Sequence, residues 1–160
     1  FRRVLFRSMI NWLDKRSLIQ LCILVLLVTG AINGWIASMN IEGVTAQKMH
    51  HSDQFFPAPY VIGTVWTLLM LSLAFCFKKL TGHRCYQKGV LFLFLICVAY
   101  PIYTIGFSSI GLMIAGNLIT ITMASFLSGI LFEKFKWLAG VVLLIPAWVV
   151  FVTYLMFFIH

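Results

Sequence analysis

Five long apolar segments are the feature of this chain that most constrains its fold. Each has close to the roughly 20 residues that a helix needs to cross about 30 Å of hydrocarbon, and none contains Asp, Glu, Lys or Arg. In a bilayer every backbone N–H and C=O must be satisfied within the protein, and these runs are too long and too uniformly apolar for barrel strands. We therefore predict an all-α integral membrane protein, a five-transmembrane-helix bundle in a single membrane domain over 9–160. The predicted helices are 18–39, 59–77, 89–107, 110–132 and 137–159.

The composition agrees with a membrane domain. Hydrophobic residues make up 62% of the chain and charged residues 10%, against about a quarter charged in soluble domains. The longest polar stretch, 43–54, is too short for a core of its own. The cysteines include no C-x-x-C pair, so we expect neither a disulfide framework nor a metal site. The histidines all lie outside the predicted helices, which disfavours a bis-histidine haem cytochrome.

We interpret residues 1–8, FRRVLFRS, as a segment of different origin from the rest of the chain. They resemble the translation of a sequencing-adapter DNA and stand directly before Met9. We therefore expect them to be non-native and leave them out of the fold prediction. Without the three arginines among them the formal net charge falls from +8 to +5.

The remaining basic residues predict the orientation. Lysine and arginine gather before the first predicted helix, between the second and third, and between the fourth and fifth, whereas the opposite side has only Lys48, against Glu42 and Asp53. Such an excess marks cytoplasmic loops, so we predict that the N-terminus is cytoplasmic and the C-terminus outside. The membrane that we expect is the bacterial cytoplasmic membrane. The lipid bilayer, including anionic lipids, is the expected partner. Loops this short form no basic groove, so nucleic acid is not an expected partner.

Two features of the helix connections and helix surfaces leave alternatives open. The first loop, 40–58, is long enough for a lid or binding element, and disorder is about as frequent in such loops. Gly30 and Gly34 form a GxxxG pair, which indicates close packing within the bundle or, less often, a dimerisation face. Pro101 predicts a kink in the third helix, because proline removes one backbone hydrogen bond.

The stretch FFPAPYVIGTVW opens the second predicted helix in an unusual way. Pro57 and Pro59 cannot donate backbone hydrogen bonds, and proline suits the first turn of a helix, so this segment predicts a stiff hinge between loop and helix. Gly63 would allow close approach to a neighbouring helix. Trp66 then lies about two turns deep, although tryptophan prefers the interface, where its N–H is wet. At that depth the N–H needs an internal partner or a ligand.

The fifth predicted helix repeats this pattern with Trp148 about halfway along and Thr153 and Tyr154 after it. If both tryptophans face the interior, they form two aromatic walls for a flat, apolar ligand. If they face lipid or fill the core, they have no such role. The residues alone leave both interpretations open.

The pattern Pro57…Gly63-x-x-Trp66-Thr67, followed by the W-x-x-F-x-T-Y-L element at 148–155, resembles the TspO/MBR family of tryptophan-rich sensory proteins. This family includes the mitochondrial translocator protein, or peripheral benzodiazepine receptor. The resemblance covers about 18–159, and the five helices and the long first loop agree with it. It implies a dimeric bundle that binds porphyrin, haem and related tetrapyrroles as ligands, with no obligatory cofactor.

The resemblance also implies candidate site residues. Trp66 and Trp148 match the two tryptophans that line the family's ligand pocket. Additional candidate residues for the wall of this pocket are Tyr100, Phe151, Tyr154 and Trp35.

The chain departs from the family pattern at several of these positions. Cys97 stands where the family typically has an asparagine, and Asn117 stands where many members have an acidic residue; we keep both as candidate ligand-binding residues. The tryptophan and tyrosine of the family's first loop are absent here. His50 and His51 lie in that loop and could reach a haem iron, although adjacent loop histidines are usually only solvated.

The leading hypothesis is therefore a receptor or sensor-type protein that binds a planar hydrophobic ligand inside the bundle, with transfer of that ligand as an extension of the same hypothesis. One alternative is a small-molecule transporter; ion coupling is disfavoured because the helices contain no ionisable residue near the midplane. Another is a structural scaffold without ligand. No catalytic residue is proposed, because the acidic residues all fall outside the predicted helices. Porphyrin degradation would follow only from the resemblance.

Overall fold

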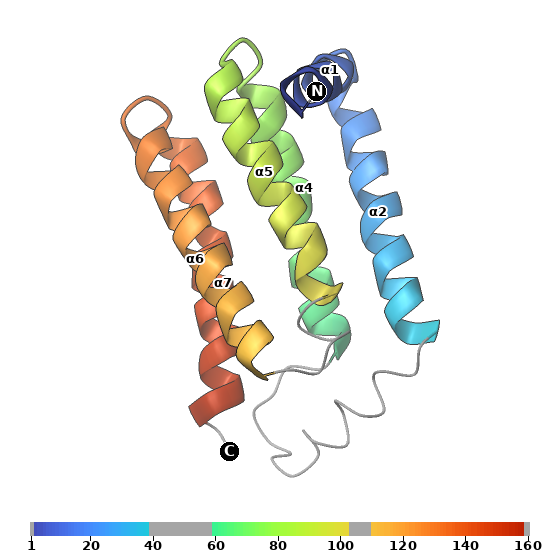
Figure 1. The fold of residues 1–160 in the computed structure, drawn as a ribbon, viewed down its shortest axis with the longest axis vertical. Helices are drawn as coiled ribbons and strands as arrows, with labels where there is room; N and C mark the ends of the chain where they lie inside the picture. The colour runs from blue at the N-terminus through green and yellow to red at the C-terminus, as the bar shows by residue number, and fades with distance from the viewer. Residues whose placement is uncertain (1, 39–58, 103–109, 159–160) are drawn as a thin grey trace.

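Six helices make up the part of the chain that the structure, a computed structural model, describes: residues 2–38, 59–102 and 110–158 (Figure 1). No strand occurs within these ranges. Five of the helices are long and apolar enough to cross a membrane. The predicted all-α bundle of five membrane-spanning helices is therefore confirmed. In order, the helices are α1 (Arg2–Asp14), α2 (Leu18–Ser38), α4 (Pro59–Lys79), α5 (Arg84–Pro101), α6 (Ile110–Phe132) and α7 (Lys136–Phe158).

The helix boundaries follow local sequence signals. Pro59 is the first residue of α4, as predicted, because a proline lacks the N–H that would be unpaired there anyway. α5 begins at Arg84, five residues before the predicted span, because the apolar segment marks the membrane-buried part of a helix and not its polar first turn. The turn between α4 and α5 contains Gly82 with φ +93°, a left-handed conformation that favours glycine. The kink predicted at Pro101 concerns residues that lie partly outside the described ranges, since α5 ends there.

α1 is a helix that the apolar segments did not predict. It lies at the end of the bundle that also holds the turns α4–α5 and α6–α7 (Figure 1). Ile10 and Leu13 are buried in the core cluster, whereas Trp12 is exposed. α1 is thus amphipathic, and it extends through residues 2–8 as well as beyond Met9. The proposed foreign origin of those first residues stays a prediction.

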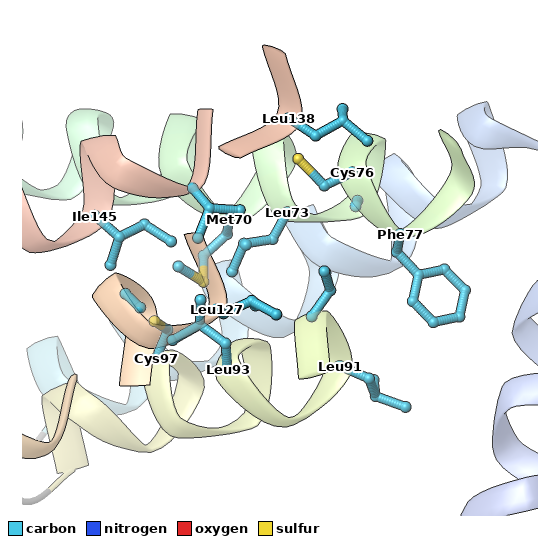
Figure 2. Packing of buried hydrophobic residues seen from close by; sticks show 14 of the residues in the cluster. Met70, Leu73, Cys76, Phe77, Leu91, Leu93, Cys97, Leu127, Leu138 and Ile145 are labelled. Carbon is cyan, nitrogen blue, oxygen red and sulfur yellow. The ribbon is translucent and has the colours of Figure 1, made fainter. Parts of the chain in front are cut away.

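The hydrophobic core lies between α4 and the helices around it. α4 contacts α2, α5 and α7, while α6 packs mainly against α7 and also against α5. Met70 and Leu73 of α4 meet Leu93 of α5, Leu127 of α6 and Ile145 of α7 in this core (Figure 2). All five are buried. α4 therefore holds the bundle together from its centre.

The outer surface of the bundle is apolar as well. Large hydrophobic side chains on the five long helices remain exposed, which is the arrangement expected where lipid replaces water as the solvent. With the five apolar spans, this shows an integral membrane protein. Examples are Ile19, Leu27, Leu68, Leu118, Phe126 and Leu144.

Gly30 and Gly34 lie on the exposed surface of α2. Apart from the glycines' own chain neighbours and the nearby α2 backbone, no described atom lies within 4 Å of where a Cβ on either glycine would stand. Close packing at this pair, which the sequence favoured, is thus not made by the described residues. The homodimer stays a prediction.

The α6–α7 hairpin is the tightest unit of the fold. Phe135 N–H donates to the carbonyl of Leu131 at 2.7 Å, which closes the turn. The hydroxyl of Ser128 on α6 donates to the carbonyl of Ala139 on α7 at 2.9 Å, in a buried position. These bonds join the two helices at the same end of the bundle as α1 (Figure 1).

Candidate functional site

Candidate residues on three helices lie at a similar depth in the bundle. With about 1.5 Å of rise per residue, Trp66 lies about 10 Å from the start of α4, Asn117 about 10 Å from the start of α6, and Trp148 about 15 Å before the end of α7. These helix ends share one side of the bundle, opposite α1 (Figure 1). Antiparallel packing thus brings residues far apart in the sequence to one level, which we call the tryptophan level.

Trp66 and Tyr100 form an aromatic pair across α4 and α5. Their ring centroids are 4.8 Å apart and the rings are tilted by 34°. Both side chains are partly buried and pack against the core cluster. Such a pair contributes about 0.5–1.5 kcal/mol beyond the area it buries. Two of the candidate ligand-binding residues, Trp66 and Tyr100, are therefore in contact with each other in this packing.

Trp148 is partly buried and packs against the core from α7. Its ring centroid lies 5.6 Å from that of Phe151, one turn further along the same helix. Within the described part of the chain, no ring contact joins Trp148 to Trp66. Phe151 and Tyr154 are exposed, as is Trp35 on α2. The structure thus brings Trp66 together with Tyr100, and Trp148 together with Phe151, as two separate pairs.

Asn117 is a buried polar residue of the tryptophan level, with 2% of its surface exposed. Its amide nitrogen donates to the Thr153 hydroxyl oxygen at 2.7 Å. That hydroxyl donates its own hydrogen to the carbonyl of Val149 at 2.6 Å, so it can only accept from Asn117. The amide oxygen of Asn117 must therefore point away from Thr153, and it has no hydrogen-bond partner among the described residues. A buried acceptor without a partner costs about 1–3 kcal/mol.

Cys97 lies in the closely packed part of α5. Its side chain is fully buried in the hydrophobic cluster (Figure 2). A thiol enclosed in this way contacts a ligand only if the neighbouring helices move apart. Its role in ligand binding stays a prediction.

The structure describes only some of the residues that were predicted to form the hinge and the first loop. Pro57, His50 and His51 lie outside the described residues. Gly63 lies within α4, and no described atom comes within 4 Å of where its Cβ would stand, so the expected close approach of a neighbouring helix is not present within the described ranges. In the part of the chain that the structure describes, no group of His, Cys, Asp or Glu side chains is placed to hold a metal ion.

Two cavities lie away from the tryptophan level. The larger, about 310 Å³, is lined by the last residue of α4, the residue before α7 and the first turn of α7. The smaller, about 50 Å³, is lined by apolar residues of α1, α2, α4 and α5. A ligand at the tryptophan level therefore requires space that neither of these cavities supplies.

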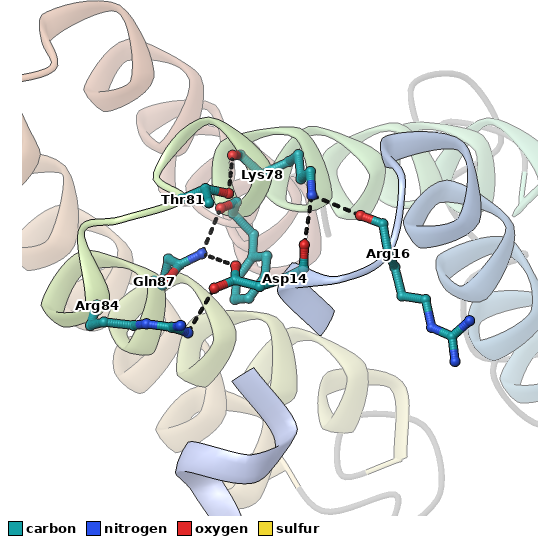
Figure 3. A network of polar contacts seen from close by, with 7 residues as sticks. Asp14, Arg16, Lys78, Thr81, Arg84 and Gln87 are labelled. Atoms are coloured by element: carbon teal, nitrogen blue, oxygen red, sulfur yellow. Dashed lines mark hydrogen bonds and ion pairs between the residues drawn. The ribbon is translucent and has the colours of Figure 1, made fainter. Parts of the chain in front are cut away.

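A polar network that the sequence did not reveal connects α1 to α4 and α5 (Figure 3). Arg84 forms an ion pair with Asp14 at 2.7 Å. The amide nitrogen of Gln87 donates to the same carboxylate and, at 3.4 Å, to the carbonyl of Phe77. Gln87 is fully buried and its amide oxygen has no partner among the described residues. Asp14 was expected outside any helix, but it ends α1 and serves as an anchor.

Lys78 completes this anchor from α4. Its ammonium group donates to the backbone carbonyls of Asp14 and Arg16 at 2.8 and 2.7 Å. Asp14 is the last residue of α1 and Arg16 follows in the connection to α2. Carbonyls at the end of a helix have no intrahelical partner, so the lysine satisfies that of Asp14 and places a positive charge at the negative end of the helix dipole. The network therefore orients α1 against the bundle.

Comparison of the chain with models of protein families, with curated proteins and with solved structures gives no match.

Proposed function

We propose that this membrane protein binds a planar hydrophobic ligand, a tetrapyrrole such as porphyrin or haem in the first instance, between its helices at the tryptophan level. It would act as a receptor or sensor that takes the ligand from the bilayer. The proposal rests on the sequence resemblance described above and on the chemistry of the residues at this level. The amide oxygen of Asn117, which has no hydrogen-bond partner among the described residues, is the single observation that carries it.

An unpartnered acceptor is informative inside a membrane bundle because no bulk water can reach it. A pyrrole N–H or another ligand donor would satisfy the Asn117 oxygen without disturbing its bond to Thr153. Trp66, Tyr100 and Trp148 lie at the same level and supply aromatic surface. One buried acceptor and several aromatic rings at one level are the kinds of groups that line small-molecule sites.

Ligand entry requires movement at the Trp66–Tyr100 pair. Because the two rings belong to different helices and lie 4.8 Å apart, a flat ligand must separate them and then stack on them. The ring contact that is lost, about 0.5–1.5 kcal/mol, is replaced by contacts of the same kind to the ligand. The contact between Trp66 and Tyr100 thus closes the proposed site in this packing.

The expected affinity is modest. Burying both faces of a planar ligand, about 150 Å² each, contributes roughly 7 kcal/mol at about 25 cal/mol per Å² before the costs of immobilisation are subtracted. A hydrogen bond to Asn117 offsets part of those costs. The net free energy of binding is therefore below about 7 kcal/mol, and we expect a Kd no tighter than about 10 micromolar.

Titration with protoporphyrin IX tests this proposal. The full chain in detergent is titrated while porphyrin absorbance and tryptophan fluorescence are followed, for the wild type and for the double substitution Trp66→Phe with Trp148→Phe. The matched control is Trp12→Phe with Trp137→Phe, which removes two exposed tryptophans from the opposite end of the bundle.

We expect saturable binding that the Trp66/Trp148 substitutions weaken about tenfold, a loss of about 1.4 kcal/mol from ring contacts, and that the control pair leaves unchanged. Binding that does not saturate, or that is equally affected by both pairs, would refute the proposal. Flux of the same porphyrin across liposomes then separates a receptor from a transporter.

A further inference from the structure

The larger cavity lies where α4 ends and α7 begins, at the end of the bundle opposite the tryptophan level. Its volume is about 310 Å³, and five residues line it: Lys79, Phe135, Lys136, Trp137 and Leu138. This volume is at the lower limit of the roughly 300–1,000 Å³ typical of small-molecule sites. The cavity therefore suits a compact group, such as a lipid headgroup, rather than a whole lipid.

The charge of this cavity is positive. Lys79 and Lys136 contribute two ammonium groups, and within 2–38, 59–102 and 110–158 neither forms an ion pair. Glu133, in the turn before α7, is exposed and is not paired with them in those ranges. The positive end of the α7 dipole adds to the same potential. An anion would thus meet two cations without having to displace a carboxylate.

Aromatic rings hold both lysines against the bundle. The Lys79 ammonium lies 5.5 Å from the Phe75 ring centroid, and the Lys136 ammonium lies 5.7 Å from that of Phe132. Such cation–π contacts limit the freedom of the side chains. Less entropy is therefore lost when an anion binds between them than for two freely moving surface lysines.

The walls of the cavity are apolar. Trp137 is 69% exposed, and its ring meets that of Phe75 edge to face at 6.4 Å. Leu138 is buried beneath the cavity. Below Lys136, Gly140 and Leu144 follow at intervals of four residues on the same face of α7, and both are exposed. The positively charged cavity is thus continuous with an exposed apolar strip on α7, formed by Gly140 and Leu144, which we call the apolar lane.

We propose that this cavity binds the phosphate group of an anionic phospholipid, whose acyl chains lie along the exposed face of α7. A soluble phosphate uses only the two lysines, whereas a lipid also uses Trp137 and the apolar lane. Tryptophan is enriched at the level of the headgroups, and the basic side of a membrane protein is where anionic lipid gathers. The site is independent of ligand binding at the tryptophan level.

Native mass spectrometry of the full chain in detergent tests the site. Phosphatidylglycerol and phosphatidylcholine with identical acyl chains are titrated into the wild type, the double substitution Lys79→Gln with Lys136→Gln, and the charge-matched control Lys15→Gln with Lys88→Gln. The control removes two exposed lysines of the same end that do not line the cavity. Circular dichroism establishes that each variant is folded, and Lys79→Arg with Lys136→Arg retains both charges.

We expect phosphatidylglycerol to bind more tightly than phosphatidylcholine, and Lys79→Gln with Lys136→Gln to weaken it about thirty-fold, since each lysine near an anionic surface contributes about fivefold. The control pair is expected to lose less than about threefold in affinity for phosphatidylglycerol, because its charges act only through screened solvent. The arginine pair is expected to retain binding. Equal loss in both glutamine pairs, or no preference between the two lipids, would overturn the proposal.

A second set of titrations distinguishes a lipid phosphate from a soluble phosphate as the ligand of this cavity. Inorganic phosphate and glycerol phosphate are added as competitors, and Trp137→Ala is titrated with phosphatidylglycerol. A lipid site predicts weak competition by both soluble anions and weaker lipid binding by Trp137→Ala. Full displacement by inorganic phosphate, with Trp137→Ala unchanged, would show a soluble-anion site and overturn the assignment to lipid.

Discussion

The anchor of α1 gives the sharpest test of the energetics, through the substitution Asp14→Ala. This change removes the acceptor of the Gln87 amide and the partner of Arg84. A hydrogen bond to a charged group contributes about 1.5–3 kcal/mol net, and Gln87 is fully buried. The ion pair adds at most about 1 kcal/mol, because the side chain of Arg84 is half exposed. We expect Asp14→Ala to lower the free energy of unfolding by about 2–3 kcal/mol.

The assay is unfolding in mixed detergent and SDS micelles, followed by far-ultraviolet circular dichroism. Arg84→Ala is the matched control, since it removes the ion pair but leaves the Gln87 bond, and we expect it to cost less than about 1 kcal/mol. Gln87→Leu, added to Asp14→Ala, should recover part of the loss, because it removes a buried amide that has lost its main partner.

The reasoning would be refuted if Asp14→Ala cost no more than Arg84→Ala. The stability would then come from the exposed ion pair, or from Lys78 acting on the α1 carbonyls, and not from the buried hydrogen bond. The same reasoning would also be contradicted if adding Gln87→Leu destabilised the Asp14→Ala variant further.

Three other predictions test the site, the packing and the orientation. Asn117→Leu removes both the amide oxygen that has no partner among the described residues and the hydrogen bond from the amide nitrogen to Thr153. Relief of the first, about 1–3 kcal/mol, outweighs loss of the second, about 0.5–1.5 kcal/mol, so the free energy of unfolding should rise by up to about 1 kcal/mol while porphyrin binding weakens; a clear loss of stability in SDS unfolding would contradict this reasoning. Gly89→Ala places a Cβ 2.7 Å from Leu127 Cδ1 and should cost about 1 kcal/mol, whereas Gly129→Ala, with open space around it, should stabilise by about 0.5–1 kcal/mol; equal shifts in SDS unfolding would contradict the packing. Cys85 is exposed at the basic end, so an impermeant maleimide should label it in inverted and not in right-side-out vesicles, with Cys85→Ser as the control; the opposite result would reverse the predicted orientation.

The five spans are the part of the fold that the sequence alone determined. Hydrocarbon excludes water, so any long uncharged apolar segment must satisfy its own backbone as a helix, whatever surrounds it. The start of α4 at Pro59 and the tight α6–α7 turn also follow from local rules. α1 escaped prediction because its buried core residues, Ile10 and Leu13 among the side chains that the structure describes, form no long apolar segment, and charged residues surround them in the sequence.

The candidate site was only partly visible in the sequence. Trp66 and Trp148 stand out because tryptophan is unusual at that depth, but their partners, Tyr100 and Phe151, are set by packing. Asn117 was noted as a departure from a family pattern, and its unpartnered oxygen becomes apparent only from the Thr153 hydroxyl bond.

Only the tertiary structure decided which faces of the helices meet. Each membrane-spanning helix is apolar all round, so its periodicity does not distinguish a lipid-facing side from a buried one. The decisive contacts also join distant residues, 73 positions apart for Asp14 and Gln87 and 36 for Asn117 and Thr153. Sequence determines that such a chain enters the membrane as helices, because that depends on solvent alone; the polar partners inside the bundle depend on how the helices pack.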